Sequence, residues 1–464
     1  MQKIAFIRNM RKIWIGALLL CNSYLSAQVV TLSREEQKEE FAIVQQLLVE
    51  AHPNLYLYGF DPEAIQQITQ NIVLREHQKN LSAYISGIKN AHTWVIPPVE
   101  VTKKSPLFPL QLKLVQNRIF IDKDYGNTNL RGHELIAING KNIEEIIKSF
   151  KPYYAIDGEI DATYSLIRDF HQPRIQTIWE GLSENYELTI KNNDSSYTKT
   201  VKAISYQTLN IAERKTKGWE FKIIDSLKTA YLDINLFTDT AFSKNHVQTW
   251  KFRKFIRQSF RKIEKYQPLH LIIDVRGNQG GLLENAAFLY AYLTDSSFVV
   301  SKETQIRLIK KPKTSAKTNF ARYMVPRRVH YRKKSDDIIL KKHISLKKIK
   351  PKKNTYQGKL SVIIDGKTNS AASIFATLVR RDNRGKLIGT ENRNSAHCFT
   401  AGKSLIVTLP YSKIKVAIPL TGLMFLDNAP IGRGLTPDQA IDLEIEEFRK
   451  QKDVFLIRAL TGEN

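Results

Sequence analysis

The sequence contains few cysteines and no long apolar run. Its 464 residues include two cysteines, Cys21 and Cys398. Removal of the amino-terminal segment described below leaves one, which excludes an intramolecular disulfide, so the fold depends on its core alone. We interpret Cys398 as a buried, unreactive thiol, because these are far more common than nucleophilic cysteines. Beyond the amino terminus no apolar stretch is long enough to form a transmembrane helix, so we expect no stable membrane span.

Acidic residues are scarce relative to basic ones. There are 45 Asp and Glu against 71 Lys and Arg, which gives a net charge of +26. This excess is compatible with binding to nucleic acid, binding to an anionic envelope surface, or simple solubility. Hydrophobic residues make up 42% and charged residues 25%, which is ordinary for a soluble globular protein, and the length allows two or three domains.

The first residues have the pattern of a secretory signal peptide. Four basic residues precede the short apolar run 13–20, and the small residues Ser26 and Ala27 follow it. The apolar run is too short to span a bilayer comfortably, so a retained anchor is the less favoured alternative. We therefore expect export to the periplasm or the cell exterior, which argues against a nucleic-acid partner.

The rest of the chain divides by pattern. Apolar residues at helical spacing within 35–50, and the pair Asp61 and Pro62, predict helices. Short alternating segments and the turn pair Asn139-Gly140 predict a small β module with a hairpin. The boundaries we predict are a signal peptide 1–27, a helical region 28–103, a β module 104–203, an α/β core 204–447 and a tail 448–464.

A basic block interrupts the predicted core at about 301–357, with roughly twenty Lys and Arg and few acids. Aromatic residues among them would suit a nucleic-acid surface. In an exported chain we favour a solvated insertion that is attracted to anionic envelope polymers.

Two strand–loop–helix units carry the candidate chemistry. In the second unit, the β-branched run Ser361–Ile364 predicts a buried strand, residues 366–369 predict a turn, and a helix follows from Ala371. Ser370 lies at the helix entrance, where free backbone N–H groups favour negative charge. It can be a nucleophile whose oxyanion has donors in place, or only an N-cap, which is the commoner role.

In the first unit, a buried strand over 269–275 runs into the glycine-rich loop 276–281, and a helix follows over 282–293. Such a loop lets the backbone approach an anion or a carbonyl oxygen. Its spacing matches neither the P-loop nor the dinucleotide fingerprint. The alternative is a tight turn held by an Asp274–Arg276 pair. His92 falls between a helix and an extended apolar strip, where a lone histidine is usually structural.

Together these units resemble the tail-specific (C-terminal processing) serine peptidases. The resemblance rests on LIIDVRGNQGG (271–281) and TNSAASIF (368–375), with KLIGTE (386–391) and GRGLTPD (432–438) following in the family's order. Ahead of the core, AHPNLY (51–56) and AHT (91–93) are similar to the helical region of the histidine-using branch, which resembles the tricorn core protease. The resemblance implies an α/β fold, with a ClpP/crotonase-like protease core, an N-terminal helical region and a PDZ-like β module.

The resemblance also implies roles for single residues. Ser370 becomes the nucleophile and His92 its base, since an imidazole titrates near neutrality. The N–H groups of Gly280 and Ala371 become the oxyanion donors. Asp274, Arg276, Asn278 and Gly281 become the structural loop. Protein or peptide substrates are implied, and no cofactor or metal.

Two departures from the family pattern bear on activity. The better-known branch uses a lysine base near Ser395, where this chain has none, and Lys403 lies too far along. The supporting acid of tricorn-like enzymes would fall at Ile431, which cannot serve. Glu391, Asp427 and Asp438 are the possible substitutes. The sequence thus predicts an exported serine endopeptidase, with an inactive homologue that binds peptides or envelope polymers as the alternative.

Overall fold

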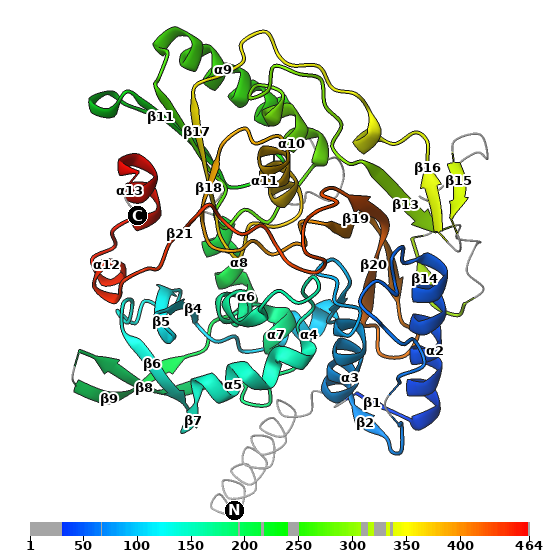
Figure 1. Cartoon of the computed structure of the whole chain (residues 1–464). Coiled ribbons are helices and arrows are strands. Elements are labelled where there is room, and N and C mark those ends of the chain that lie inside the picture. Colours follow the sequence, from blue (N-terminus) through cyan, green and yellow to red (C-terminus); the bar gives the residue numbers. More distant parts are fainter. Residues whose placement is uncertain are drawn as a thin grey trace, which may run out of the picture.

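The computed structural model describes residues 30–65, 67–193, 195–214, 218–239, 250–307, 314–319, 331–334 and 337–462. Over these residues the chain has a mixed α/β fold with three larger sheets and one two-stranded pair (Figure 1), which confirms the predicted fold class at that level. The predicted signal peptide lies outside the described residues, as do 308–313, 320–330 and 335–336 of the basic block. Within the described part of the chain, no helix has both the length and the apolar character needed to cross a bilayer.

The central sheet is mostly parallel. Its strand order is β10 (Trp219–Ile224), β11 (Thr229–Ile234), β12 (His270–Asp274), β17 (Lys359–Ile364), β18 (Lys386–Gly389) and β21 (Gln439–Ala440). Only β10 runs antiparallel to its neighbour. The register between β12 and β17 pairs Asp274 with Ile363, so the loops that follow these strands leave the same edge side by side.

Helices cover both faces of this sheet. Alternate residues of β11, β12 and β17 pack against α9 (Trp250–Tyr266), α10 (Leu283–Tyr290) and α11 (Ala371–Arg381) in the main hydrophobic core. The residues between them, such as Ile272 and Ile363, pack against α13 (Val454–Thr461) on the other face. Burial on both faces explains the continuous apolar runs of β12 and β17. The predicted strand and helix of each unit are confirmed, although α10 ends before the predicted residue 293.

A second sheet joins the amino-terminal helices to the core. Its order is β14 (Lys317–Thr318), β19 (Cys398–Thr408), β20 (Lys415–Met424), β13 (Glu303–Arg307), β16 (Asp337–Leu340) and β15 (Tyr331–Lys334), with β3 (Trp94–Ile96) paired to β20. The helices α2 (Arg34–Ala51) and α3 (Leu74–Ser86) pack against β19 and β20 (Figure 1). The short pair β1 (Thr31–Leu32) and β2 (Ile72–Val73) lies beside them.

The predicted helix at Asp61 is wrong. The carboxylate of Asp61 accepts a hydrogen bond from the N–H of Glu63 in a turn, and the next helix begins only at Leu74. Among the described residues of this segment, Ile65 and Ile68 are the apolar contacts with the core, too few to offset the cost of starting a helix.

The third sheet forms the β module. Its order is β4 (Leu110–Val115), β5 (Arg118–Asp124), β6 (Glu134–Ile138), β8 (Asn185–Asn192) and β9 (Ser195–Lys202), with β7 (Lys141–Asn142) paired to β6. The predicted hairpin is confirmed: Asn139 and Gly140 connect β6 to β7 with φ of 49° and 74°. The module's helices include α5 (Ile143–Phe150), α6 (Ala162–Asp169) and α7 (Pro173–Gln176). The remaining helices are α4 (Val99–Lys104), α8 (Tyr206–Arg214) and α12 (Ile445–Arg449).

Candidate active site

Ser370 lies at the junction of β17 and α11, as predicted, and is half-buried. The loop before it is held by hydrogen bonds to the neighbouring strand's loop. The carboxylate of Asp365 accepts a hydrogen bond from the N–H of Gly277 (2.9 Å), and the hydroxyl of Thr368 donates to the carbonyl of Val275 (3.0 Å). These bonds bring the two strand–loop–helix units together at one edge of the sheet.

The backbone of Ser370 has an unusual conformation, with φ of 54° and ψ of −122°. Non-glycine residues rarely adopt positive φ, and such conformations cluster at functional sites where the surrounding structure enforces them. The Ser370 N–H donates to Oδ1 of Asn394 at 2.6 Å, and the hydroxyl makes no capping hydrogen bond. The N-cap alternative is therefore not supported by the geometry.

Gly280 packs directly against the serine. A Cβ atom built on Gly280 would lie 2.6 Å from Cβ of Ser370 and 3.0 Å from the nitrogen of Ala371. The two predicted oxyanion donors differ in whether their N–H group already has a hydrogen-bond acceptor. Among the described residues the N–H of Ala371 has no hydrogen-bond partner, whereas the N–H of Gly280 already donates to Oδ1 of Asn278 (2.7 Å).

The other predicted loop residues have structural contacts. The guanidinium of Arg276 pairs with both Asp274 and Asp453. The amide of Asn278 donates to the carbonyl of Ile234 (2.6 Å). Gly281, with φ of 134°, leaves no room for a side chain beside Phe237. These contacts fix the glycine-rich loop against β11 and the carboxyl-terminal tail.

His92 follows α3 in a turn that precedes β3. Its ring stacks on Phe399 of β19, with centroids 5.6 Å apart and planes 8° apart. Both ring nitrogens are buried and have no hydrogen-bond partner among the described residues. Burial, together with the positive charge of Arg393, lowers the pKa of His92 to about 4. The imidazole is therefore neutral at pH 7, which is the form that a general base requires.

A buried carboxylate connects the serine and histidine loops. Asp157 accepts hydrogen bonds from the N–H of Ala91 (2.7 Å) and from the amide of Asn394 (2.8 Å). Ala91 precedes His92, and the same Asn394 side chain accepts the N–H of Ser370, so three hydrogen bonds link the two loops. No hydrogen bond joins Ser370 to His92 itself. The sequence analysis missed Asp157, because nothing in its local spacing distinguishes it from other acids.

The three acids predicted as possible supports for His92 each bind other residues instead. Glu391 binds the guanidinium of Arg433 and the N–H of Gly434 (2.8 Å). Asp427 forms an exposed ion pair with Lys302. Asp438 binds Arg380 and accepts the N–H of Leu387 (2.7 Å). Among the described residues, none of these carboxylates contacts the ring of His92.

No lysine occupies the position of the better-known branch's base, and Lys367 and Lys403 differ in burial. The position where the better-known branch has its lysine holds Ser395, whose buried hydroxyl has no partner among the described residues. Lys403 is exposed on β19. Lys367, which the sequence analysis did not consider, is buried three residues before Ser370 and lies 2.7 Å from Asp169.

No cluster of His, Cys, Asp or Glu in the described part of the chain is arranged to hold a metal ion.

A cavity of about 460 Å³ borders these loops. It includes Asn369, which precedes the serine, and Ala91, which precedes the histidine. Its full lining is Ala91, Trp94, Gln111, Lys123, Arg168, Asp169, Gln172, Arg174, Asn235, Leu236, Arg276, Gly277, Gln279, Lys367, Asn369 and Arg393. We call this cavity the cleft.

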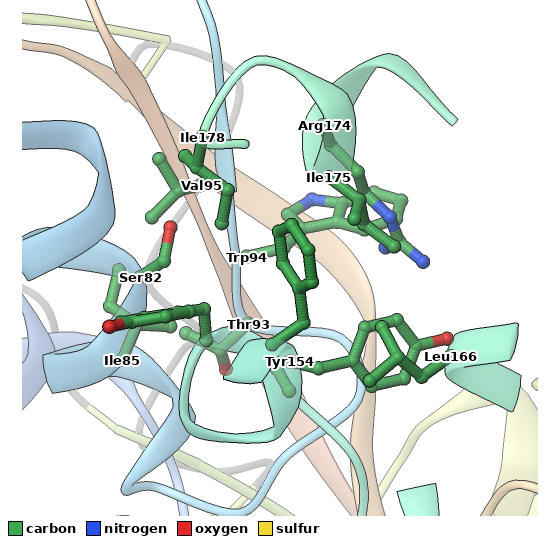
Figure 2. A pocket seen from close by; sticks show the side chains of 13 residues that line it. Ser82, Ile85, Thr93, Trp94, Val95, Tyr154, Leu166, Arg174, Ile175 and Ile178 are labelled. Atoms are coloured by element: carbon green, nitrogen blue, oxygen red, sulfur yellow. The ribbon is translucent and has the colours of Figure 1, made fainter. Parts of the chain in front are cut away.

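A smaller apolar pocket of about 40 Å³ adjoins the cleft (Figure 2). Ile85, Val95 and Ile175 are among the residues that line it, and Trp94 and Arg174 line both cavities. The site therefore combines a half-buried serine, a neutral histidine on a linked loop, and an adjacent cleft that can receive a ligand.

Comparisons with known proteins bear on the family and on the fold. Residues 228–440 match the sequence model of peptidase family S41. The crystal structure of mature CPAF is similar with a TM-score of 0.65 at 14% identity, over 93% of this chain and 98% of that one. The structure of mature CPAF complexed with lactacystin gives the same TM-score and identity, over 93% and 99%.

At this identity the likeness to CPAF shows a shared fold, and it extends over nearly the whole chain. No curated protein sequence matches. The matched region contains both strand–loop–helix units, with Ser370 and the glycine-rich loop inside it. The core of this chain, residues 228–440, thus matches peptidase family S41, which is consistent with the resemblance to the tail-specific serine peptidases.

Proposed function

We propose that this protein is an exported serine endopeptidase in which Ser370 is the nucleophile and His92 the general base. The observation that carries the proposal is the strained conformation of Ser370, at φ 54°, on a loop that Asn394 and Asp157 link to the loop of His92. A strained serine at a strand-to-helix turn is held in place by its surroundings and exposes its hydroxyl to a bound substrate.

In the proposed reaction the hydroxyl oxygen of Ser370 attacks the carbonyl carbon of the scissile peptide bond. A ring nitrogen of His92 takes the hydroxyl proton and returns it to the leaving amine. The free N–H of Ala371 donates to the oxyanion. Water then hydrolyses the acyl-enzyme, with His92 again acting as base.

Asp157 has a positioning role in this proposal. It contacts Ala91 and Asn394 but not the ring of His92, so it orients the two loops without touching reacting atoms. Catalytic hydrogen bonds are often long before substrate binds, and the contact between Ser370 and His92 would form as the cleft is filled.

Export rests on the amino-terminal sequence pattern of residues 1–27. The β module 104–203 would dock an extended peptide end by adding a strand to its sheet, as PDZ domains do. The basic block at about 301–357 would bind anionic envelope polymers through its excess of Lys and Arg.

The alternative is an inactive homologue that binds peptides in the same cleft. Two observations favour it: no hydrogen bond joins Ser370 to His92, and no carboxylate contacts the histidine ring among the described residues. It differs from the first proposal in predicting no reactive serine.

A fluorophosphonate probe separates the two proposals. It should label the wild-type protein, and Ser370→Ala and His92→Ala should each lose the label. Ser395→Ala is the matched control, because it removes another buried hydroxyl close by, and it should keep the label. Labelling that survives Ser370→Ala would refute the assignment, and a folded wild type that never reacts would support the binding protein.

A further inference from the structure

The cleft has many more positive than negative side chains. Six of its lining residues are Lys or Arg and one is an acid: Lys123, Arg168, Arg174, Arg276, Lys367, Arg393 and Asp169. The charges of two of these cations are balanced by carboxylates that do not line the cleft. Arg168 lies 3.1 Å from Asp365, and Arg276 binds Asp274 and Asp453.

Three other cations share a single carboxylate. Asp169 lies 2.7 Å from Lys367, 2.7 Å from Arg174 and 3.2 Å from Arg393. Its Oδ2 atom also accepts the hydroxyl of Tyr154 (2.7 Å). Although burial raises the pKa of Asp169, the three cations hold it well below its usual range, so the group carries one negative charge. With all three cations protonated, these cations and Asp169 together carry two positive charges in excess, and the Asp157 carboxylate, which also acts on Arg393, offsets one of them when it is ionised.

This excess charge is largely buried. The side chains of Lys367 and Arg393 are 6% and 4% exposed. Nε of Arg393 has no hydrogen-bond partner among the described residues. An uncompensated buried charge is unfavourable, and an unpaired guanidinium N–H is a donor without an acceptor. A ligand carboxylate in the cleft would satisfy both requirements at once.

Arg174 is the most exposed of the three cations, so it is the one placed to meet such a ligand first. Its side chain is 27% exposed, and its guanidinium lies over the rings of Trp94 (5.6 Å) and Tyr154 (5.4 Å). Figure 2 shows Trp94 and Arg174 side by side at one side of the apolar pocket. Packing between aromatic rings fixes the guanidinium plane, so less freedom is lost when it binds a carboxylate.

The cluster lies beside the reacting residues. Lys367 belongs to the loop that ends at Ser370. Arg393 precedes Asn394, which binds the N–H of Ser370. The backbone N–H of Arg393 donates to the carbonyl of Thr368 in the serine loop (3.1 Å). A carboxylate held here would therefore belong to a substrate segment close to the scissile bond.

We propose that Arg174, Lys367 and Arg393 form a subsite that binds a substrate carboxylate and makes the protein selective for acidic peptides. The carboxylate has two sources, an Asp or Glu side chain near the scissile bond or the free carboxyl end of the peptide. The inference rests on the proposed function, because it takes the cleft to be the substrate site.

The test measures peptide binding without turnover, on Ser370→Ala protein. The probes are fluorescent, otherwise neutral nonapeptides in which a single Glu is moved along the sequence, each paired with its Gln counterpart and each made with a free or an amidated carboxyl end. Fluorescence anisotropy gives their dissociation constants. Charge-assisted hydrogen bonds predict that one carboxylate-bearing peptide binds about ten- to a hundredfold more tightly than its neutral counterpart.

The peptide change that weakens binding identifies which carboxylate occupies the subsite. A drop on Glu→Gln assigns the side chain, and a drop on amidation assigns the carboxyl end. Adding Arg174→Gln should reduce the preference, whereas Lys403→Gln, an exposed cation on β19, should preserve it. Equal binding of every charged and neutral pair, within twofold, would overturn the proposal.

This outcome is distinguishable from failure of the proposed function. Unreactive wild-type protein in the fluorophosphonate assay would reject the peptidase while leaving the anisotropy comparison readable. Reactive protein that binds acidic and neutral peptides equally would reject only the subsite. The peptide comparison needs no change in the cleft, so it stands even if Arg174→Gln does not fold.

Discussion

The backbone conformation of Ser370 leads to a stability prediction that is independent of catalysis. At φ 54° and ψ −122°, an L-residue brings its Cβ into steric conflict with the backbone, whereas glycine has no such conflict. The variants Ser370→Gly and Ser370→Ala both remove a hydroxyl that makes no capping hydrogen bond. They differ in whether the Cβ remains, so their comparison isolates the strain.

The expected difference can be worked out from two opposing terms. A residue held in such a sparsely populated region costs about 1–3 kcal/mol, which Ser370→Gly releases and Ser370→Ala keeps. Glycine also gives the unfolded chain more freedom, which destabilises the native state by about 0.5–1 kcal/mol relative to alanine. We therefore expect Ser370→Gly to be the more stable variant by up to about 2.5 kcal/mol.

Urea unfolding followed by tryptophan fluorescence measures this difference through the two transition midpoints. The matched control is Ser373, three residues further along inside α11. There both variants lose the same two hydrogen bonds, to Thr368 and Asn392, and ordinary helix propensity should make Ser373→Ala more stable than Ser373→Gly by about 1 kcal/mol. The order should thus reverse between the two positions.

If Ser370→Ala is the more stable variant of its pair while the control behaves as expected, the serine backbone is not strained. The main structural support for a nucleophile would then be removed.

Two further predictions concern the chemistry of the site. Gly280→Ala should abolish fluorophosphonate labelling and lower the urea midpoint, because φ is 101° and the new Cβ would lie 2.6 Å from Cβ of Ser370; wild-type labelling would refute the packing described for this loop. The labelling rate should stay on its plateau down to about pH 5, because burial lowers the pKa of His92 to about 4 and the base stays neutral until then. The same shift means that the unfolded chain takes up this proton near pH 6.5 and the folded chain only near pH 4, so His92 lowers stability as the pH falls between these values. A labelling rate that falls by half near pH 6.5 would show that a histidine with an ordinary pKa is the base.

Much of the local structure followed from the sequence. The β-branched runs before Arg276 and before Ser370 predicted buried strands, and the Asn139-Gly140 pair predicted a hairpin, which are all present. These features depend on side-chain periodicity and on turn residues that tolerate positive φ, so neighbouring residues suffice to determine them. The helix predicted at Asp61 failed because a good capping residue does not make a helix without enough apolar contacts.

Local pattern was enough to place a serine at a helix entrance after one buried strand and a glycine-rich loop after another; that the two strands are neighbours was seen only in the folded chain. The surroundings of that serine likewise depend on contacts between distant segments. Asp157 and Asn394 are 237 positions apart, and their contact links the two loops. The three cations that share Asp169 come from three separate loops and helices. The physical reason is that spacing along the chain encodes hydrogen bonds within an element, whereas contacts between distant segments depend on how whole sheets and helices pack against one another.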